Sequence, residues 1–253
     1  MDFLLGLLQL IGVHTILGLS AYVVLQTGQV TMAQAGFFSI GAYIAAMLTA
    51  LAGWHILPAL LVGAMAAGIV AGLVGFPALR VKGLMLVVAT VAFGEFIRLF
   101  WFNFDYQIAK GDILIGPEGG EGFKQIRFFP ENGWTTGEVA LFIWVFVILI
   151  MAALWWVDRS RAGAVLRAVG TDEMAAQSSG INLTKVKVTA FAAGGFIAGI
   201  GGAIYAHYTT HIEHLNFSIL LATFAIAYPI LGGLRTVFGT LPVSYTHLTL
   251  PTT

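Results

Sequence analysis

Cysteine is absent from the 253 residues, and charged residues make up only 9% of them. The first absence excludes disulfides and thiolate metal sites. The second excludes an ordinary soluble domain, in which about 25% of residues are charged. The formal net charge is zero, which argues against nucleic acid as a partner. The first apolar stretch begins with Asp2 rather than a basic region, so no cleavable signal peptide is predicted.

Hydrophobic residues, by contrast, make up 58% of the chain, and the mean hydropathy is +0.90. Several apolar segments approach the roughly 20 residues that a helix needs to cross a bilayer. The sequence therefore predicts an all-α fold, a polytopic transmembrane helix bundle with about seven spans. We expect these spans near residues 3–25, 30–52, 55–77, 83–104, 138–157, 188–207 and 215–238.

Lys and Arg are distributed unevenly between the two sets of loops that alternate along these spans. Basic residues remain preferentially on the cytoplasmic side of a membrane. The segment 158–187 is therefore predicted to be cytoplasmic, and the Gly-rich loop 105–137, which holds Lys110, Lys124 and Arg127, is predicted to be external. The first span would then enter from outside. The eight residues of the basic-rich set are Arg80, Lys82, Arg159, Arg161, Arg167, Lys185, Lys187 and Arg235.

The polar segment 158–187 separates two apolar spans and contains two predicted helices. Good helix formers run from Ala162 to Val169, and Thr171 is predicted to cap a second, short helix with acidic residues in its first turn. Gly180 is a natural stop for that helix. A short helix of small residues suits docking into a groove on another protein. A solvated connection whose charges only enforce the topology is the alternative.

Four stretches of this chain resemble, in order, the branched-chain amino-acid permease family of bacterial ABC importers. They are GQVTMAQAGFFSIGAYIAAMLTA at 28–50, RVKGLMLVVATVAFGEFIRL at 80–99, RAGAVLRAVGTDEMAAQSSGINLTKVKVTAFAAGGFIAGIGGAIYAHY at 161–208, and LGGLRTVFG at 231–239. Within the third, DEMAAQSSGIN is similar to the cytoplasmic loop with which such permeases contact their ATP-binding subunits. The resemblance assigns that contact to Arg167, Asp172, Glu173, Ala175, Ala176 and Gly180.

The resemblance implies a permease subunit in a bacterial inner membrane, not an enzyme, for a branched-chain amino acid. Its expected partners are two ATP-binding cassette subunits, a second homologous permease, an external or periplasmic solute-binding protein and the lipid bilayer. No cofactor is expected in this chain, because ATP and magnesium would bind to the partner subunits. The alternatives are a permease of the same scaffold for urea or another small amide or amino acid, and an ion-coupled secondary transporter.

Polar residues inside the spans are candidates for the substrate pathway. Gln29, Thr31, Gln34 and Gly36 interrupt the second span, as happens where transporters expose backbone to a substrate; plain hydrogen bonding between helices is the alternative. Glu95 is a further candidate, although Arg98 three residues later favours a pair that neutralises itself.

Small residues and histidines give two more patterns. Gly195, Gly199 and Ala203 recur every four residues, which indicates close helix packing, with a substrate path as the alternative. His207, His211 and His214 would share a face on a continuous helix and could hold a cation there; interfacial histidines without metal are the favoured interpretation.

Residues 1–241 are predicted to form the transmembrane permease domain. The last stretch, PVSYTHLTLPTT at 242–253, is polar and rich in residues that favour strands. It is expected to lie outside the family sequence, as a truncation or assembly artefact.

Overall fold

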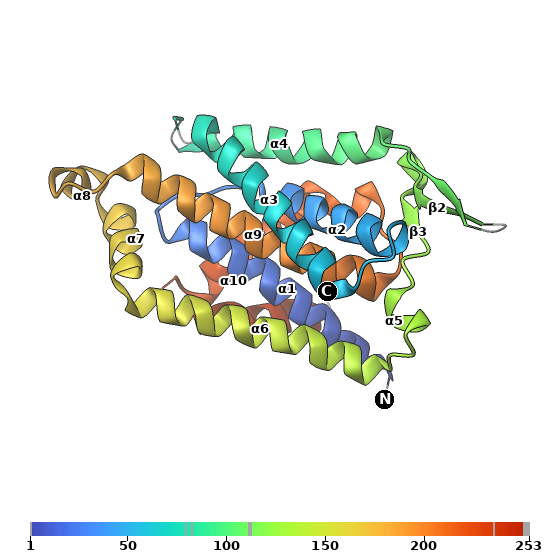
Figure 1. Ribbon diagram of the computed structural model, residues 1–253. Helices are drawn as coiled ribbons and strands as arrows, with labels where there is room; N and C mark the ends of the chain where they lie inside the picture. Colours follow the sequence, from blue (N-terminus) through green and yellow to red (C-terminus); the bar gives the residue numbers. More distant parts are fainter. Residues whose placement is uncertain (1, 79, 82, 111–112, 235, 250–253) are drawn as a thin grey trace.

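The computed structural model describes residues 2–78, 80–81, 83–110, 113–234 and 236–249. Within these ranges, five helices are long and apolar enough to cross a membrane and two are shorter. An all-α polytopic bundle is therefore confirmed. The five long helices are α1 (Asp2–Leu25), α3 (Ile56–Ala78), α4 (Leu84–Asn103), α6 (Thr136–Arg159) and α9 (Leu183–Thr209), and the shorter ones are α2 (Gln34–Ala50) and α10 (Ile219–Gly232) (Figure 1).

The two shorter helices begin later than the predicted spans 30–52 and 215–238, because the preceding segments are tied to other parts of the bundle. Before α2, the chain turns at Gly28, whose φ is +74°, and the Thr90 hydroxyl oxygen of α4 accepts a hydrogen bond from the Met32 amide at 3.0 Å. Before α10 lies the 3-10 turn η2 (His214–Phe217). Both predicted spans thus start with non-α-helical backbone.

Helix α9 lies at the centre of the bundle and packs against α1, α2 and α3. Glycines make this close approach possible. A Cβ atom on Gly202 would overlap the carbonyl oxygen of Phe38 in α2, and one on Gly41 would overlap the backbone of Gly199. Two of the predicted packing residues face α3, since Gly195 meets Ala71 and Gly199 meets Ala67. The third, Ala203, is 1% exposed.

Helix α4, in contrast, lies at the edge of the bundle. Only 17% of its most apolar window is buried, against 67% for α9. A helix whose apolar residues are largely uncovered suits contact with lipid or with another membrane-embedded chain. The most apolar windows of α3 and α6, which flank the central helices, are also only partly buried (Figure 1).

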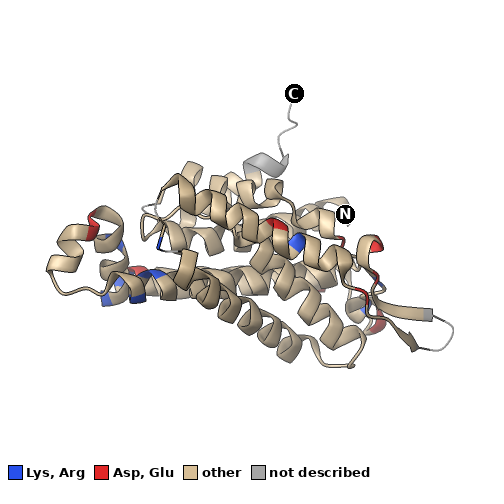
Figure 2. Cartoon of the chain, turned by 90° about the horizontal axis from the view of Figure 1, so that it is seen from above, with Lys and Arg blue, Asp and Glu red and all other residues tan. Residues whose placement is uncertain are grey.

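The two ends of the bundle differ in structure. At one, here called the α8 end, the short helices α7 (Arg161–Thr171) and α8 (Glu173–Ser178) connect α6 to α9 (Figure 1). Figure 2 shows Lys and Arg gathered there. Of the eight residues in the predicted basic-rich set, Lys82 and Arg235 lie outside the described residues.

The other end, here called the sheet end, carries the loop 105–137. It contains the antiparallel sheet β1 (Ile108–Lys110), β2 (Ile113–Pro117) and β3 (Phe123–Lys124), the turn η1 (Gly119–Glu121) and the short helix α5 (Phe128–Glu131). Helix α1 starts at this end, where the Gln9 side-chain amide donates to the Thr136 carbonyl of α6 at 2.8 Å. It finishes at the α8 end, where Gly28 lies against Gly170.

A last helix, α11 (Thr240–Thr249), follows the turn η3 (Val237–Gly239) and returns along α1. The buried hydroxyl groups of Ser244 and Thr15 are hydrogen-bonded at 2.8 Å. Residues 242–249 are thus helical rather than extended as their composition favoured, and the Ser244 hydroxyl group has its partner in the neighbouring helix. The predicted boundary at residue 241 falls inside this helix, and residues 250–253 lie outside the described residues.

Candidate functional site

The first candidate site is α8 itself, which is capped at both ends by its own sequence. Asp172 has extended backbone angles, and its carboxylate accepts hydrogen bonds from the amides of Met174 at 2.8 Å and Ala175 at 3.0 Å. The prediction that Thr171 caps this helix is therefore wrong. Thr171 is still helical and ends α7, where its hydroxyl donates to the Arg167 carbonyl. A residue must leave helical angles before its side chain can cap the next helix.

Gly180 stops α8 as predicted. Its φ is +82°, a left-handed angle that glycine adopts without a Cβ penalty. Its amide donates to the Gln177 carbonyl at 3.0 Å, and the Ile181 amide donates to the Ala176 carbonyl at 3.1 Å. These two bonds form the Schellman motif that satisfies the last carbonyls of a helix.

The two faces of α8 have different surroundings. Met174 is 81% exposed, and Ala175 is also exposed, so together they form an outward surface of small and apolar groups. Ala176 is buried against the bundle. The Glu173 carboxylate forms an ion pair with Lys187 of α9, with Oε1 and Nζ 2.6 Å apart. Glu173, one of the predicted contact residues, is thus engaged within the chain.

Arg167, another predicted contact residue, secures α7 to the end of α6. Its guanidinium donates to the Asp158 carbonyl at 2.8 Å. The Asp158 carboxylate in turn accepts a hydrogen bond from the Tyr22 hydroxyl of α1 at 2.7 Å. Together with the close approach of Gly170 to Gly28, these contacts fix α7 against α1 and leave α8 at the tip.

The predicted pathway residues do not form one cluster. Thr31 accepts a hydrogen bond from the Ala33 amide at 3.2 Å, which orders the turn before α2. Gln29 instead lines a hollow of about 330 Å³ at the α8 end, together with Glu173 of α8 and Leu84 at the start of α4. The segment before α2 therefore lies beside α8.

Gln34 and Gly36 belong to the buried contacts of α2. The Ser20 hydroxyl of α1 donates to the Gln34 side-chain oxygen at 3.2 Å, whereas the Gln34 amide nitrogen has no hydrogen-bond partner within the described residues. A Cβ atom on Gly36 would lie 3.1 Å from the Phe93 ring and 3.4 Å from Gly94, both in α4. The geometry at Gly36 is that of close helix packing.

Glu95 forms the intrahelical pair that the spacing favoured. Arg98 Nε lies 2.7 Å from Glu95 Oε2, and both side chains are partly exposed along α4. An acidic group with a cation three residues away in the same helix has its charge balanced locally. Glu95 lies on the sparsely buried α4, whereas Gln34 is buried in the core.

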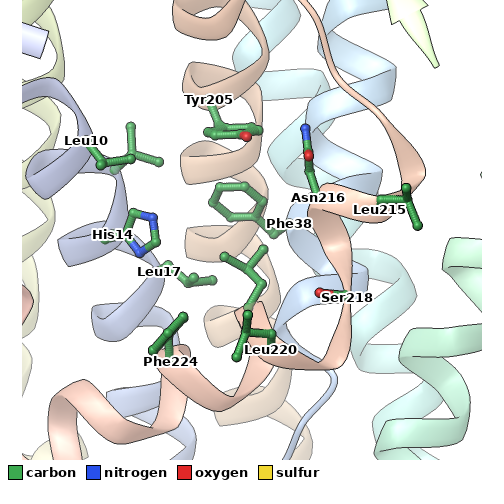
Figure 3. A pocket seen from close by; sticks show the side chains of 12 residues that line it. Leu10, His14, Leu17, Phe38, Tyr205, Leu215, Asn216, Ser218, Leu220 and Phe224 are labelled. Atoms are coloured by element: carbon green, nitrogen blue, oxygen red, sulfur yellow. The ribbon is translucent and has the colours of Figure 1, made fainter. Parts of the chain in front are cut away.

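A second candidate site is a cavity of about 290 Å³ between α1, α2, α9 and the start of α10. Figure 3 shows apolar side chains around most of it, with polar groups of His14, Tyr205, Asn216 and Ser218 among them. The His14 ring nitrogen Nδ1 is 3.0 Å from the Tyr228 hydroxyl, which holds the imidazole in place. The apolar lining consists of Leu10, Val13, Leu17, Phe38, Leu215, Leu220, Leu221 and Phe224.

Sequence reasoning did not predict this cavity. One available signal was His14, an ionisable residue inside an apolar span, which is the type that marks functional positions in membranes. The other polar residues gave no signal, because Asn216 and Ser218 resemble ordinary loop residues before a helix. Only the packing of α1 beside α9 and α10 places them around one space.

The three histidines do not share a helix face, since α9 ends at Thr209. His207 is buried and bonds to the Thr49 hydroxyl at 2.8 Å, and His211 lies 2.8 Å from the Glu213 carboxylate. His214 packs edge-on against Phe102. Within the described ranges, no group of three or more His, Asp or Glu side chains is arranged to hold a metal ion.

The His214 imidazole lies outside the membrane-spanning helices, in the turn before α10. Burial lowers its pKa from the ordinary value, and the positive charge of Arg98 lowers it further, with partial compensation from Glu213. The lowered pKa favours the neutral form of His214, as expected of a partly desolvated imidazole near a guanidinium.

Long apolar helices around a central glycine-rich helix, with a capped helix at one end and an amphipathic cavity between the helices, are the architecture of a multi-pass membrane protein. The chain belongs to the family described as branched-chain amino acid transport system / permease component, which matches residues 3–250. This confirms the resemblance drawn from the four sequence stretches.

The individual proteins to which this chain is similar are also named permeases. The chain is 29% identical to the high-affinity branched-chain amino acid transport system permease protein LivM of Salmonella typhimurium, and equally to that of Escherichia coli, over 90% of this chain and 56% of each relative. It is 30% identical to the ribose import permease protein RbsC of Haemophilus influenzae over 39% of this chain and 32% of that protein. The chain thus spans about half the length of the LivM proteins. No solved structure matches it.

Proposed function

We propose that this chain is the membrane-spanning permease subunit of an ABC importer that moves leucine, isoleucine or valine across the bacterial inner membrane. The observation that carries the proposal is α8. It is a short helix, capped by Asp172 and Gly180, which projects from one end of the bundle with Met174 outward. Such a helix suits insertion into a groove of a partner, and the partner proposed here is an ATP-binding cassette subunit.

In the complete importer, two such subunits would dock at the cytoplasmic face, which is the α8 end. A second, homologous permease would pair with this chain in the membrane, and a solute-binding protein would deliver the amino acid at the sheet end. ATP and magnesium would bind to the cassette subunits. Their closure would displace α8, and the bundle would then open toward the other side by alternating access.

The amphipathic cavity between α1, α9 and α10 is the proposed place for the branched side chain. Its apolar lining matches an aliphatic group, and its polar groups, His14, Tyr205, Asn216 and Ser218, would face the ammonium and carboxylate. A site of this composition fixes a small ligand by a few placed polar groups inside an apolar surface. One of the relatives is named a ribose import permease. Proteins related to this chain are therefore not all named for amino-acid transport.

Reconstitution of the chain with its partner subunits in proteoliposomes tests the function. We expect uptake of leucine that requires ATP and a soluble binding protein. Uptake of urea or ribose but not leucine would refute the substrate, and uptake driven by a proton or sodium gradient without ATP would refute the ABC mechanism.

A matched pair of variants tests the cavity. Leu220→Trp narrows it, whereas Leu141→Trp lies on the outer surface of α6 in a separate apolar hollow. Both leucines are exposed to a similar degree, 60% and 68%. We expect Leu220→Trp to reduce leucine uptake about tenfold, as the loss of about 1.4 kcal/mol of binding free energy does, and Leu141→Trp to leave it unchanged. Equal uptake by both variants would refute the cavity.

A further inference from the structure

The ion pair between Glu173 and Lys187 has an unusual environment for surface charges. Lys187 is only 5% exposed, although lysine is almost never fully buried unless it is paired. Its ammonium lies 2.6 Å from the Glu173 carboxylate, whose side chain is 31% exposed. Separating a buried ammonium from its anionic partner is costly, because the charge is then left uncompensated. The pair therefore restrains the relative positions of α8 and α9.

Among the described residues, little of α8 itself is buried against the bundle. The helix has six residues, of which only Ala176 is buried. The connection to α9 passes through Gly180, which has a left-handed φ, and Asn182, whose side chain caps α9 by accepting a hydrogen bond from the Lys185 amide. Because this connection contains no regular structure, it can bend without moving α9, and a rigid link has to come from side chains.

Helix α9 is the element through which a displacement would spread. It contacts α1, α2 and α3 over most of its length, and its residue Tyr205 lines the amphipathic cavity. At Gly199 and Gly202, the backbone of α9 lies directly against the backbone of α2. A movement of the base of α9 is therefore transmitted as a movement of packed backbones rather than absorbed by rotamers.

We infer that the Glu173–Lys187 ion pair is the link that carries the displacement of a docked α8 into α9, and so into the transport cavity. Both residues are positioning residues, since neither contacts the cavity. The inference rests on the proposed function for its role in transport, whereas the restraint of α8 by the pair is a property of this chain alone. Glu173 was predicted from the sequence to contact a partner subunit, but in this inference it acts on α9 of its own chain.

The test compares Lys187→Met with Lys185→Met in the reconstituted complex. Lys185 is an exposed lysine in the first turn of the same helix, so it controls for the loss of one basic residue at this end. Lys187→Met leaves no buried charge unpaired, because Glu173 remains accessible to water. Uptake, ATP hydrolysis and retention of the cassette subunits are measured for each variant.

We expect Lys187→Met to retain the cassette subunits and ATP hydrolysis, while uptake per ATP falls about tenfold, within the usual range of coupling between sites. Lys185→Met should match the wild type. The exchange Glu173→Lys with Lys187→Glu should restore uptake per ATP to within about fivefold, the remaining loss arising from a cation at the positive end of α8. An unchanged ratio in Lys187→Met, or an equal loss in Lys185→Met, would overturn the inference.

Hydrogen exchange separates this inference from the proposed function. In the purified permease, the amides of residues 175–178 should exchange about tenfold faster in Lys187→Met than in Lys185→Met, because the restraint on α8 is lost. Equal exchange in the two variants refutes the link whether or not ATP drives uptake. If wild-type protein shows no ATP-driven uptake but exchange differs as expected, the proposed function fails and the restraint stands.

Discussion

Replacing Gly202 by alanine should weaken the contact between α2 and α9. The new methyl group would overlap the carbonyl oxygen of Phe38 and lie 3.1 Å from the amide nitrogen of Ala42. Both obstacles are backbone atoms of α2, which cannot rotate away as a flexible side chain could. The two helices must therefore separate, and the contacts on either side of Gly202 lose part of their packing.

The magnitude follows from two opposing effects. Overpacking of a close contact costs about 1–3 kcal/mol, and an overlap with backbone belongs at the upper end. Alanine in place of a helical glycine returns about 1 kcal/mol. The net loss is about 2 kcal/mol, which lowers the midpoint of thermal unfolding by about 4–8 °C for a chain of this size. Tryptophan fluorescence of the purified protein during heating measures that midpoint.

Gly72→Ala in α3 is the matched control, because its methyl group would meet only the Ala192 side chain at an ordinary 3.6 Å. This variant keeps the gain in helix propensity without the overlap, so its midpoint should rise by about 2–4 °C. If the midpoint of Gly202→Ala equals or exceeds that of Gly72→Ala, the close approach of α2 and α9 is refuted.

Three more predictions concern the ends of the bundle. The chain has no cysteine, so single cysteines can be introduced to test the orientation. A cysteine in place of Ser178 should react with an impermeant thiol reagent only after cells are opened, whereas one in place of Glu131 should react in intact cells with a permeable outer membrane. The reverse pattern would contradict the orientation. Gly180→Val places a branched side chain at φ +82°, which costs about 1 kcal/mol. The variant permease should insert into the membrane normally but lose its cassette subunits in co-purification. Full retention of those subunits would argue against docking through α8. Because burial lowers the folded-state pKa of His214, the unfolded chain binds its proton first, and stability should fall as the pH drops below about 6.5. His214→Gln should reduce this loss in thermal unfolding measured from pH 7 to 5, and an unaltered pH dependence would contradict the assignment.

Features that depend on neighbouring residues could be predicted from the sequence. Apolar runs of bilayer length specify the long helices, and interruptions by Gly28 and Gly180 specify where the backbone turns, because glycine alone enters left-handed angles freely. The uneven distribution of Lys and Arg specified which segments share an end. The prediction that failed at this level, Thr171 as a cap, missed by one residue, since both Thr171 and Asp172 can cap a helix and only the backbone angles decide between them.

Which distant side chains meet depends instead on how the helices pack together. Lys187 became the partner of Glu173 because α8 folds back on α9, and His14 became part of a cavity because α1 lies beside α9 and α10. Likewise, the backbone of Phe38 is the neighbour of Gly202 only through the crossing of α2 and α9. Helical periodicity tells which residues of one helix share a face, but not which helix covers that face. That choice depends on how all the helices exclude one another in a common volume, and no local pattern contains it.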